Sequence, residues 1–199
     1  MSAFDRVNLS HNPFGELSTE QWVASALVDV EAYRVLLEQP GTALQFLGRC
    51  GRGKTTHLRA VCAATPRASW VRARVEPPIR AEIRVVDEFD SVWPWTRWQH
   101  VRGARSVAVA THRDQTTELR LYGFRVHTVE VTQTDLERLQ QIVQRRILVA
   151  RRGPGSVPSI PRSHLAALHR EHGDDIRAIM HALYGWFQNA YAGESHVQL

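Results

Sequence analysis

Short apolar runs in the first two thirds of the chain predict buried strands. The runs are Thr42–Leu47 (TALQFL), Ser69–Val75 (SWVRARV), Ile83–Val86 (IRVV), Ser106–Ala110 (SVAVA) and Arg125–Val131 (RVHTVEV). They are rich in Val and Ala and bounded by turn residues, which suits a sheet covered on both faces. The pattern therefore predicts an α/β fold with a five-stranded, mostly parallel sheet flanked by helices.

Helical spacing of apolar residues precedes and follows these strands. Ser18–Gln21 (STEQ) fits a capping box, and the helix that it starts should end near Gln39–Gly41. Another helix begins near Lys54. After Val131 the pattern becomes helical throughout: a stripe runs from Leu136 to Ile147, and two more helices are predicted over residues 163–172 and 174–192.

This change of pattern predicts two domains. Residues 1–132 would form the α/β core with an N-terminal helical segment, and residues 133–199 a small all-helical lid. The capping box that opens the lid is Thr134–Glu137 (TDLE). One connection does not fit a parallel sheet, because only Glu76–Glu82 separates the second and third strands and parallel strands need a longer crossover. Either the second strand is antiparallel or its boundaries differ.

Composition is that of an ordinary globular chain. The 199 residues are 43% hydrophobic and 23% charged, and no apolar run approaches the roughly 18 residues of a membrane span. The first residues, MSAFDRVNLS, do not resemble a signal peptide, and two cysteines make no disulfide framework. We therefore expect a cytoplasmic protein without membrane insertion. The net charge of +5 is spread along the chain and gives only a weak indication of nucleic acid.

The strongest motif follows the first strand. Residues 48–55 read GRCGRGKT, which matches G-x-x-x-x-G-K-[ST] between a strand and a helix. Its lysine is the only one among the 25 basic residues of the chain, so a compact ammonium is used where arginine is used everywhere else. We predict that the loop binds ATP through Gly48, Arg49, Cys50, Gly51, Arg52, Gly53, Lys54, Thr55 and Thr56.

The chemistry of phosphate binding explains the motif. Gly48 and Gly53 allow backbone conformations that turn N–H groups toward an anion, and the helix N-terminus adds partial positive charge. Lys54 would reach the β- and γ-phosphates, and the Thr55 hydroxyl would face Mg²⁺. The absence of a guanine-reading N-K-x-D motif favours ATP over GTP, since Lys54 is the only lysine.

A second acidic element ends the third predicted strand. Ile83–Asp90 reads IRVVDEFD, so Asp87 and Glu88 stand at the carboxyl end of a buried strand. Asp87 would hold Mg²⁺ with Thr55, and Glu88 would orient or deprotonate the attacking water. The plain alternative is a pair of solvated carboxylates. Asp90 is expected to be a surface or capping residue.

Together these motifs resemble a compact AAA+ ATPase over nearly the whole chain. HNPFG at His11–Gly15 is similar to the opening of secretion-pathway and transposition-helper ATPases, and GDDIRA at Gly173–Ala178 to the second-sensor helix of the origin-recognition branch. The resemblance implies that Thr111 senses the γ-phosphate, that Arg177 contacts it from the lid, and that Asn12, Pro13 and Phe14 lie near adenine. The alternatives are a strand end, a solvated helix residue and a core anchor.

Several other features leave alternatives open. The cluster Val92–Trp98 (VWPWTRW) suits base stacking or a partner hot spot, although a buried core edge is the simplest interpretation. The arginines 145, 146, 151 and 152 suit phosphate binding or, more simply, a solvated helix end. Oxidation of Cys50 would block the loop. His164, His169 and His172 are not spaced for one zinc site.

We predict an Mg²⁺-dependent ATPase that uses its nucleotide state to move the lid and control a protein or DNA partner. The glutamate in catalysis is Glu88, with Lys54, Thr111 and Arg177 at the phosphates. The alternative is a non-hydrolysing adaptor that recruits DNA or protein through Trp93–Trp98. A nucleotide-dependent homo-oligomer is left open, with Arg113 and Arg120 as candidate trans-acting arginines.

Overall fold

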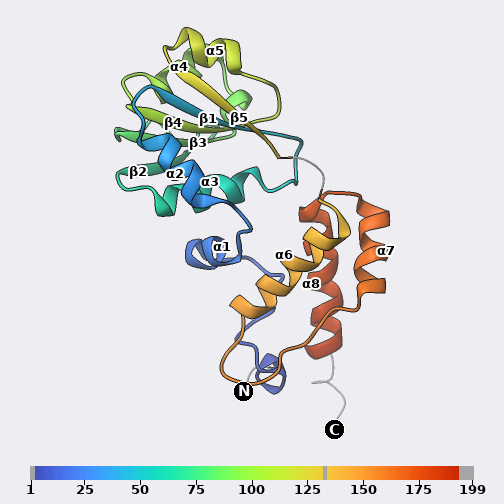
Figure 1. The fold of residues 1–199 in the computed structure, drawn as a ribbon. Helices are drawn as coiled ribbons and strands as arrows, with labels where there is room; N and C mark the ends of the chain where they lie inside the picture. The colour runs from blue at the N-terminus through green and yellow to red at the C-terminus, as the bar shows by residue number, and fades with distance from the viewer. Residues whose placement is uncertain (1–2, 132–133, 193–199) are drawn as a thin grey trace. The chain divides into compact units, whose positions relative to one another are not determined.

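The computed structural model describes residues 3–131 and 134–192, which form two compact units (Figure 1). One unit spans Ala26–Thr132 and contains the whole sheet. The other joins Met1–Ser25 to Gln133–Leu199 and is helical. Each unit is described by itself below.

The α/β unit is built on a wholly parallel sheet. Its strands run in the order β2-β3-β4-β1-β5, and each neighbouring pair is parallel. Their bounds are β1 (Thr42–Leu47), β2 (Ala68–Arg72), β3 (Ile83–Asp87), β4 (Ser106–Thr111) and β5 (Arg125–Glu130). The predicted fold class is confirmed. Because all strands point the same way, their carboxyl ends meet at one edge of the sheet.

The second strand is parallel, and the predicted boundary was wrong. β2 ends at Arg72 rather than Val75, so ten residues, 73–82, connect it to β3 without a helix. A turn starts at once, since the backbone N–H groups of Val75 and Glu76 donate to the Arg72 carbonyl (3.2 and 3.0 Å). The alternation of apolar residues continues past Arg72, so the sequence pattern did not predict this turn.

Helices cover both faces of the sheet (Figure 1). On one face α2 (Val30–Glu38) and α3 (Lys54–Ala64) pack on Leu44 and Phe46. On the other face, α4 (Pro94–Val101) and α5 (Thr116–Leu121) pack with a short 3₁₀ turn, η2 (Phe89–Ser91). α4 and α5 were not predicted, because each is shorter than the window of about 11 residues over which helical periodicity becomes visible.

The helical unit combines both ends of the chain. Its elements are η1 (Ala3–Val7), α1 (Thr19–Ser25), α6 (Leu136–Val149), α7 (Arg162–His172) and α8 (Ile176–Ala192). Here the structure differs from the predicted domain boundaries, which grouped residues 1–25 with the α/β core. The apolar side chains Phe4, Leu9 and Phe14 are buried with α6 and α8 instead.

Arginines of α6 and of the residues just after it bind the N-terminal segment. The Arg146 guanidinium donates to the carbonyls of Pro13 (2.9 Å) and Gly15 (2.8 Å), and burial lowers the pKa of Arg146 to about 10. Arg145 donates to the Ala24 carbonyl (2.8 Å), and Arg152 pairs with a carboxylate of the same segment. The interpretation as a solvated helix end was therefore wrong for Arg146, whereas Arg145, Arg151 and Arg152 are exposed, as that interpretation expected.

The predicted long N-terminal helix is two helices. The Ser18–Gln21 capping box is present: the Ser18 N–H donates to Gln21 Oε1 (2.9 Å), and the Gln21 N–H donates to Ser18 Oγ (3.3 Å). The helix that it opens ends at Ser25, and α2 has its own cap, Asp29. Likewise Asp135, not Thr134, caps α6, accepting from the Arg138 N–H (2.7 Å).

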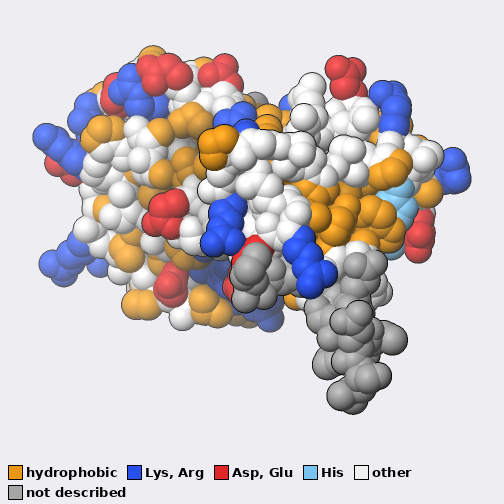
Figure 2. Space-filling view, turned by 90° about the horizontal axis from the view of Figure 1, so that it is seen from below, with side chains coloured by type: hydrophobic (Ala, Val, Ile, Leu, Met, Phe, Trp, Pro, Cys, Tyr) orange, Lys and Arg blue, Asp and Glu red, His pale blue; other side chains and the backbone are white. Residues whose placement is uncertain are grey.

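The outer surface carries no broad field of one charge on the face drawn in Figure 2. Lys and Arg side chains there lie among acidic and apolar ones, as expected from the even spread of basic residues along the sequence. Among the helices of the described residues, none is both long and apolar enough to cross a bilayer.

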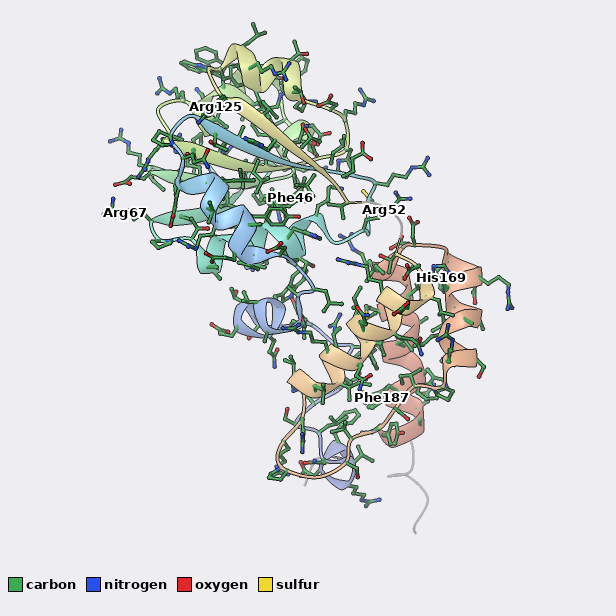
Figure 3. All side chains as sticks on the ribbon, viewed as in Figure 1. Phe46, Arg52, Arg67, Arg125, His169 and Phe187 are labelled. Atoms are coloured by element: carbon green, nitrogen blue, oxygen red, sulfur yellow. The ribbon has the colours of Figure 1, made fainter. Side chains whose placement is uncertain are left out.

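Each unit has a hydrophobic core of its own. Phe46 is fully buried between the sheet and α3, and Phe187 is fully buried where α8 meets the N-terminal segment (Figure 3). The Phe187 ring contacts Phe14 edge-on at 5.5 Å and stacks near Phe4 at 6.1 Å. Aromatic packing thus ties residues from opposite ends of the chain.

Candidate functional site

The loop between β1 and α3 has the backbone that a phosphate cradle requires. Gly51 and Gly53 have φ of +80° and +91°, in the left-handed region that side chains disfavour, and Gly53 caps α3. Gly48 is needed for a different reason, because a Cβ there would lie 2.7 Å from the Val131 carbonyl oxygen. Its N–H donates to the Thr111 carbonyl (3.1 Å), so neighbouring strand ends brace the loop.

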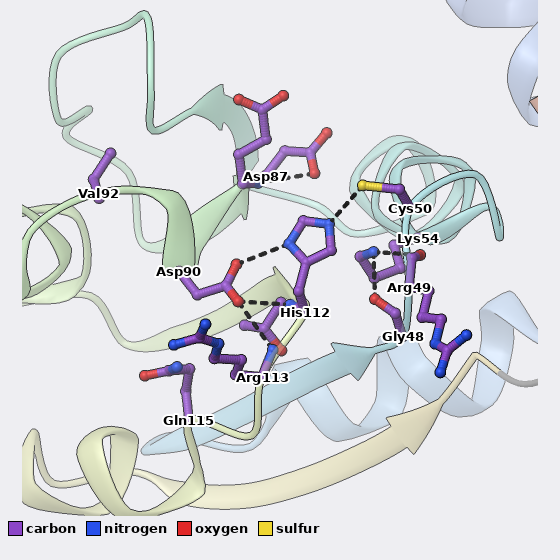
Figure 4. A network of polar contacts seen from close by, with 12 residues as sticks. Gly48, Arg49, Cys50, Lys54, Asp87, Asp90, Val92, His112, Arg113 and Gln115 are labelled. Carbon is purple, nitrogen blue, oxygen red and sulfur yellow. Dashed lines mark hydrogen bonds and ion pairs between the residues drawn. The ribbon is translucent and has the colours of Figure 1, made fainter.

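Lys54 lies over this loop. The residue is 7% exposed, and Nζ donates to the carbonyls of Gly48 (2.6 Å) and Arg49 (2.8 Å), as Figure 4 shows. An ammonium buried this far needs oxygen partners, and the loop supplies them. The cation is therefore held by loop carbonyls at the N-terminus of α3.

Thr55 and Asp87 meet beside the lysine. Thr55 Oγ1 donates to Asp87 Oδ2 (2.9 Å), although β1 and β3 are separated by β4 in the sheet. Asp87 is only 3% exposed, and its other oxygen accepts from the Glu88 N–H (3.0 Å). A hydroxyl and a buried carboxylate side by side are hard oxygen ligands of the kind that Mg²⁺ takes together with phosphate oxygens. The donor set fits that ion.

Glu88 has an unusual backbone conformation. Its φ of 55° and ψ of 33° are left-handed for a residue with a side chain, which costs on the order of 1 kcal/mol or more. The carboxylate is partly exposed, and Oε1 lies 3.9 Å from Arg72 Nε at the end of β2. The turn therefore directs Glu88 along the carboxyl edge of the sheet, in reach of β2.

Thr111 faces the core at the end of β4. Its side chain is fully buried, and Oγ1 donates to Gln45 Oε1 (3.3 Å) inside the sheet. In this arrangement the hydroxyl is used within the fold, and its part in sensing phosphate stays a prediction.

His112, the next residue, was missed by the sequence analysis. Its Nε2 lies 3.2 Å from Cys50 Sγ in the phosphate loop, and its Nδ1 lies 3.2 Å from Asp90 Oδ1 (Figure 4). The available signal was its place one residue beyond a buried strand. That place alone does not indicate a functional residue, because Cys50 and Asp90 are distant in the sequence.

Asp90 holds the loop after β4 in place. Its Oδ2 accepts from the backbone N–H groups of His112 (2.7 Å) and Arg113 (3.0 Å), so it is a capping residue, as expected. A hollow of about 430 Å³ opens next to it. Its lining residues are Asp90, Ser91, Arg97, His112, Arg113 and Gln115.

The remaining predicted nucleotide residues belong to the helical unit. The Asn12 side chain donates to the Tyr184 carbonyl and to Gln188 (3.1 Å each), and it accepts from the Phe14 N–H (3.0 Å). Phe14 is buried in the helical core, while Arg177 is exposed in the first turn of α8. These contacts hold Asn12, Pro13 and Phe14 in their own unit, and any role toward adenine or phosphate stays a prediction.

The tryptophan cluster is a surface and not a core edge. Trp93 is 82% exposed and Trp95 65% exposed, so the interpretation as a buried edge was wrong for both. The Trp95 and Trp98 rings stack at 4.7 Å, and the Arg102 guanidinium lies 4.9 Å from the Trp98 ring. An exposed π-stack ending in a cation is suited to contact another flat or apolar group.

The sheet is parallel, and a glycine-rich loop leads from β1 into α3. Lys54, Thr55 and Asp87 lie together at this loop. These features define a P-loop nucleoside triphosphatase fold. No family model matches the sequence, and no curated protein matches it. Among solved structures, Orc1 of Aeropyrum pernix in complex with DNA is similar over 85% of this chain and 64% of its own, with TM-score 0.59 and 18% identity.

Two further structures agree. The Thermotoga maritima RuvB Holliday junction branch migration motor matches 90% of this chain and 64% of its own, with TM-score 0.58 and 14% identity. A DNA replication initiation factor matches 82% and 61%, with TM-score 0.55 and 14% identity. The chain thus has the fold of AAA+ P-loop ATPases, as the sequence resemblance predicted, and spans less than two thirds of these neighbours' length.

Proposed function

We propose that this chain binds ATP with Mg²⁺, hydrolyses it, and uses the nucleotide state to move its helical lid and control a macromolecular partner in the cytoplasm. The observation that supports the proposal best is the Thr55–Asp87 hydrogen bond beside Lys54, because it brings the start of α3 and the end of β3 together where a phosphate and a metal ion would bind. Mg²⁺, when bound, would neutralise phosphate charge there.

Each residue of the α/β site would have a separate role in binding or hydrolysis of ATP. N–H groups of Gly48–Thr56 bind phosphate oxygens, and Lys54 moves from the loop carbonyls to the β- and γ-phosphates. Thr55 and Asp87 hold the metal. Glu88 accepts the proton of the attacking water, or orients that water, from the turn after β3.

Residues of the helical unit and the end of β4 complete the proposal. Arg177 would contact the γ-phosphate from the lid, Asn12, Pro13 and Phe14 would border adenine, and Thr111 would respond to the γ-phosphate at the end of β4. Loss of that phosphate would then release the lid, a common way of coupling hydrolysis to domain movement.

Two substitutions test the ATPase. Lys54→Ala should weaken binding of a fluorescent ATP analogue at least about 100-fold, because a charged partner of the phosphates is lost. Glu88→Gln should bind the analogue normally and slow phosphate release about 100-fold or more. Glu82→Gln is the matched control: this exposed glutamate precedes β3 and pairs with Arg67. Normal turnover by Glu88→Gln would show that another group activates the water.

A second candidate function rests on the exposed tryptophans. The chain could hold nucleotide without turnover and recruit DNA or protein through Trp93 and Trp95, which stand in the segment that follows Asp90. One structural neighbour is a complex with DNA. Sustained phosphate release, with or without DNA, would exclude the adaptor. Light scattering with ATP and Mg²⁺ would detect a ring, in which case Arg113 and Arg120 become the arginines to substitute.

A further inference from the structure

Cys50 stands at the third position of the phosphate loop and is exposed. Its Sγ is 3.2 Å from His112 Nε2, and His112 Nδ1 is 3.2 Å from Asp90 Oδ1. Thiol, imidazole and carboxylate therefore stand in line, contributed by the loop after β1, the loop after β4 and the turn after β3 (Figure 4).

This order is that of a nucleophile, a base and a group that orients the base. Asp90 is well placed for the last task, because its carboxylate is largely buried and is fixed by two backbone N–H groups of the His112 loop. With the Nδ1 proton directed at Asp90, Nε2 is free to accept the thiol proton.

The charges around the thiol add an independent argument. Arg49 and Arg52 flank Cys50, Lys54 follows, and the loop Gly48–Thr55 contains no acidic residue. Reactive cysteines occur in exposed, electropositive surroundings of this kind. The same charges attract an anionic reagent.

The second cysteine provides a contrast. Cys62 lies in α3 against the sheet, and burial raises the pKa of its thiol. Cys50 is therefore exposed with an imidazole beside it, whereas Cys62 is partly buried in an environment that disfavours its thiolate.

We propose that Cys50 is a modification site for anionic low-molecular-weight disulfides, such as oxidised glutathione, and that the resulting mixed disulfide excludes nucleotide. The Cys50 proton passes to His112 Nε2 as the sulfur attacks one sulfur of the reagent. A new S–S bond forms, the reagent's S–S bond breaks, and the departing thiolate takes the proton from His112. Cys50 is oxidised, and half of the reagent leaves reduced as a thiol.

The blocking effect rests on the proposed ATP site. A glutathionyl group on Cys50 would place two carboxylates and considerable bulk beside the N–H groups that cradle phosphate. Reduction by a thiol restores the loop, so the modification is reversible.

The chemistry is tested on the full chain by intact-mass measurement during incubation with oxidised glutathione. One adduct should form in the wild type and in Cys62→Ser, and Cys50→Ser should react at least about 10-fold more slowly. His112→Gln should slow modification about 10-fold or more and change its pH profile, because the base is lost. Asp90→Asn should slow it less. Equal reaction of the two cysteines, or an unchanged rate in His112→Gln, overturns the site.

The consequence is tested separately with a fluorescent ATP analogue. Modified protein should bind at least about 10-fold more weakly, and dithiothreitol should restore binding. If the adduct forms and the analogue still binds, exclusion of nucleotide is wrong. If unmodified protein does not bind the analogue, the proposed ATP site fails while the mass measurement still decides the chemistry at Cys50.

Discussion

The α/β unit and the helical unit are held together in different ways. The α/β unit is made from one continuous segment of the chain, and its candidate site lies at the edge where the parallel strands end. The second joins both chain ends through contacts such as Arg146 with Pro13 and Asn8 with Gly153, more than 130 positions apart. The order of strand, loop and helix in the sequence is enough to predict the site of the α/β unit. The pairing of the two segments that form the helical unit becomes visible only in the folded chain.

Removing one core ring from each unit gives the largest expected effect. Phe187→Ala should destabilise the helical unit, and Phe46→Ala the α/β unit, by about 3–5 kcal/mol each through lost burial and a residual cavity. Hydrogen exchange checks the comparison. In Phe187→Ala, exchange should accelerate in residues 3–25 together with 134–192. Acceleration confined to 134–192 would show that the N-terminal segment is stabilised elsewhere.

The partly buried Arg146 should have the next largest effect. Arg146→Ala removes a guanidinium and leaves the carbonyls of Pro13 and Gly15 without that partner, which we expect to cost about 2–3 kcal/mol. The matched variant is Arg145→Ala, which loses one exposed bond to Ala24 and should cost under about 1 kcal/mol. Denaturant unfolding measures both, and equal losses would refute the role assigned to Arg146.

Substituting one glycine in each unit, Gly48 and Gly185, should have smaller effects on stability. Gly48→Ala should cost about 1–3 kcal/mol and weaken nucleotide binding, because its Cβ would approach the Val131 carbonyl and the backbone must shift. Gly185→Ala, in α8 with open space around it, should stabilise the protein by about 0.5–1 kcal/mol. Thermal melting of both variants should therefore show shifts of opposite sign.

The smallest effect concerns pH and the α/β unit alone. His100 is fully buried in α4, and burial together with the Arg84 charge lowers its pKa. The unfolded chain therefore takes up the proton first. Stability should be complete above pH 6.5 and fall below it, by at most about 1.4 kcal/mol per pH unit. Melting at pH 7 and pH 5 measures this fall, which His100→Phe should reduce.

The sequence predicted well wherever neighbouring residues determine the structure. β1 and the start of α3 have the expected bounds, because a buried strand, glycines and a lysine follow one another directly. It failed where distant residues decide. Nothing near Trp93 indicates exposure, and the end of β2 at Arg72 depends on a turn whose partners lie outside the apolar pattern.

The candidate site also contains residues that could be predicted from their neighbours in the sequence and residues that could not. Asp87 could be found from its place after β3, and the structure brings it to Thr55. His112 could not, because its importance comes from Cys50 and Asp90, which lie 62 and 22 positions away. Contacts of that kind follow from the strand order, which places β4 between β1 and β3.

The single lysine has a practical consequence. A lysine-specific protease has one peptide bond to cut in this chain, the bond after Lys54, where a loop becomes a helix and the side chain is buried. The rate of cleavage at that bond therefore reports how often the phosphate loop opens, because the protease has no other cleavage site in the chain. Each full-length chain gives either an intact band or the same two fragments, so a simple gel can follow the loop as ligands are added.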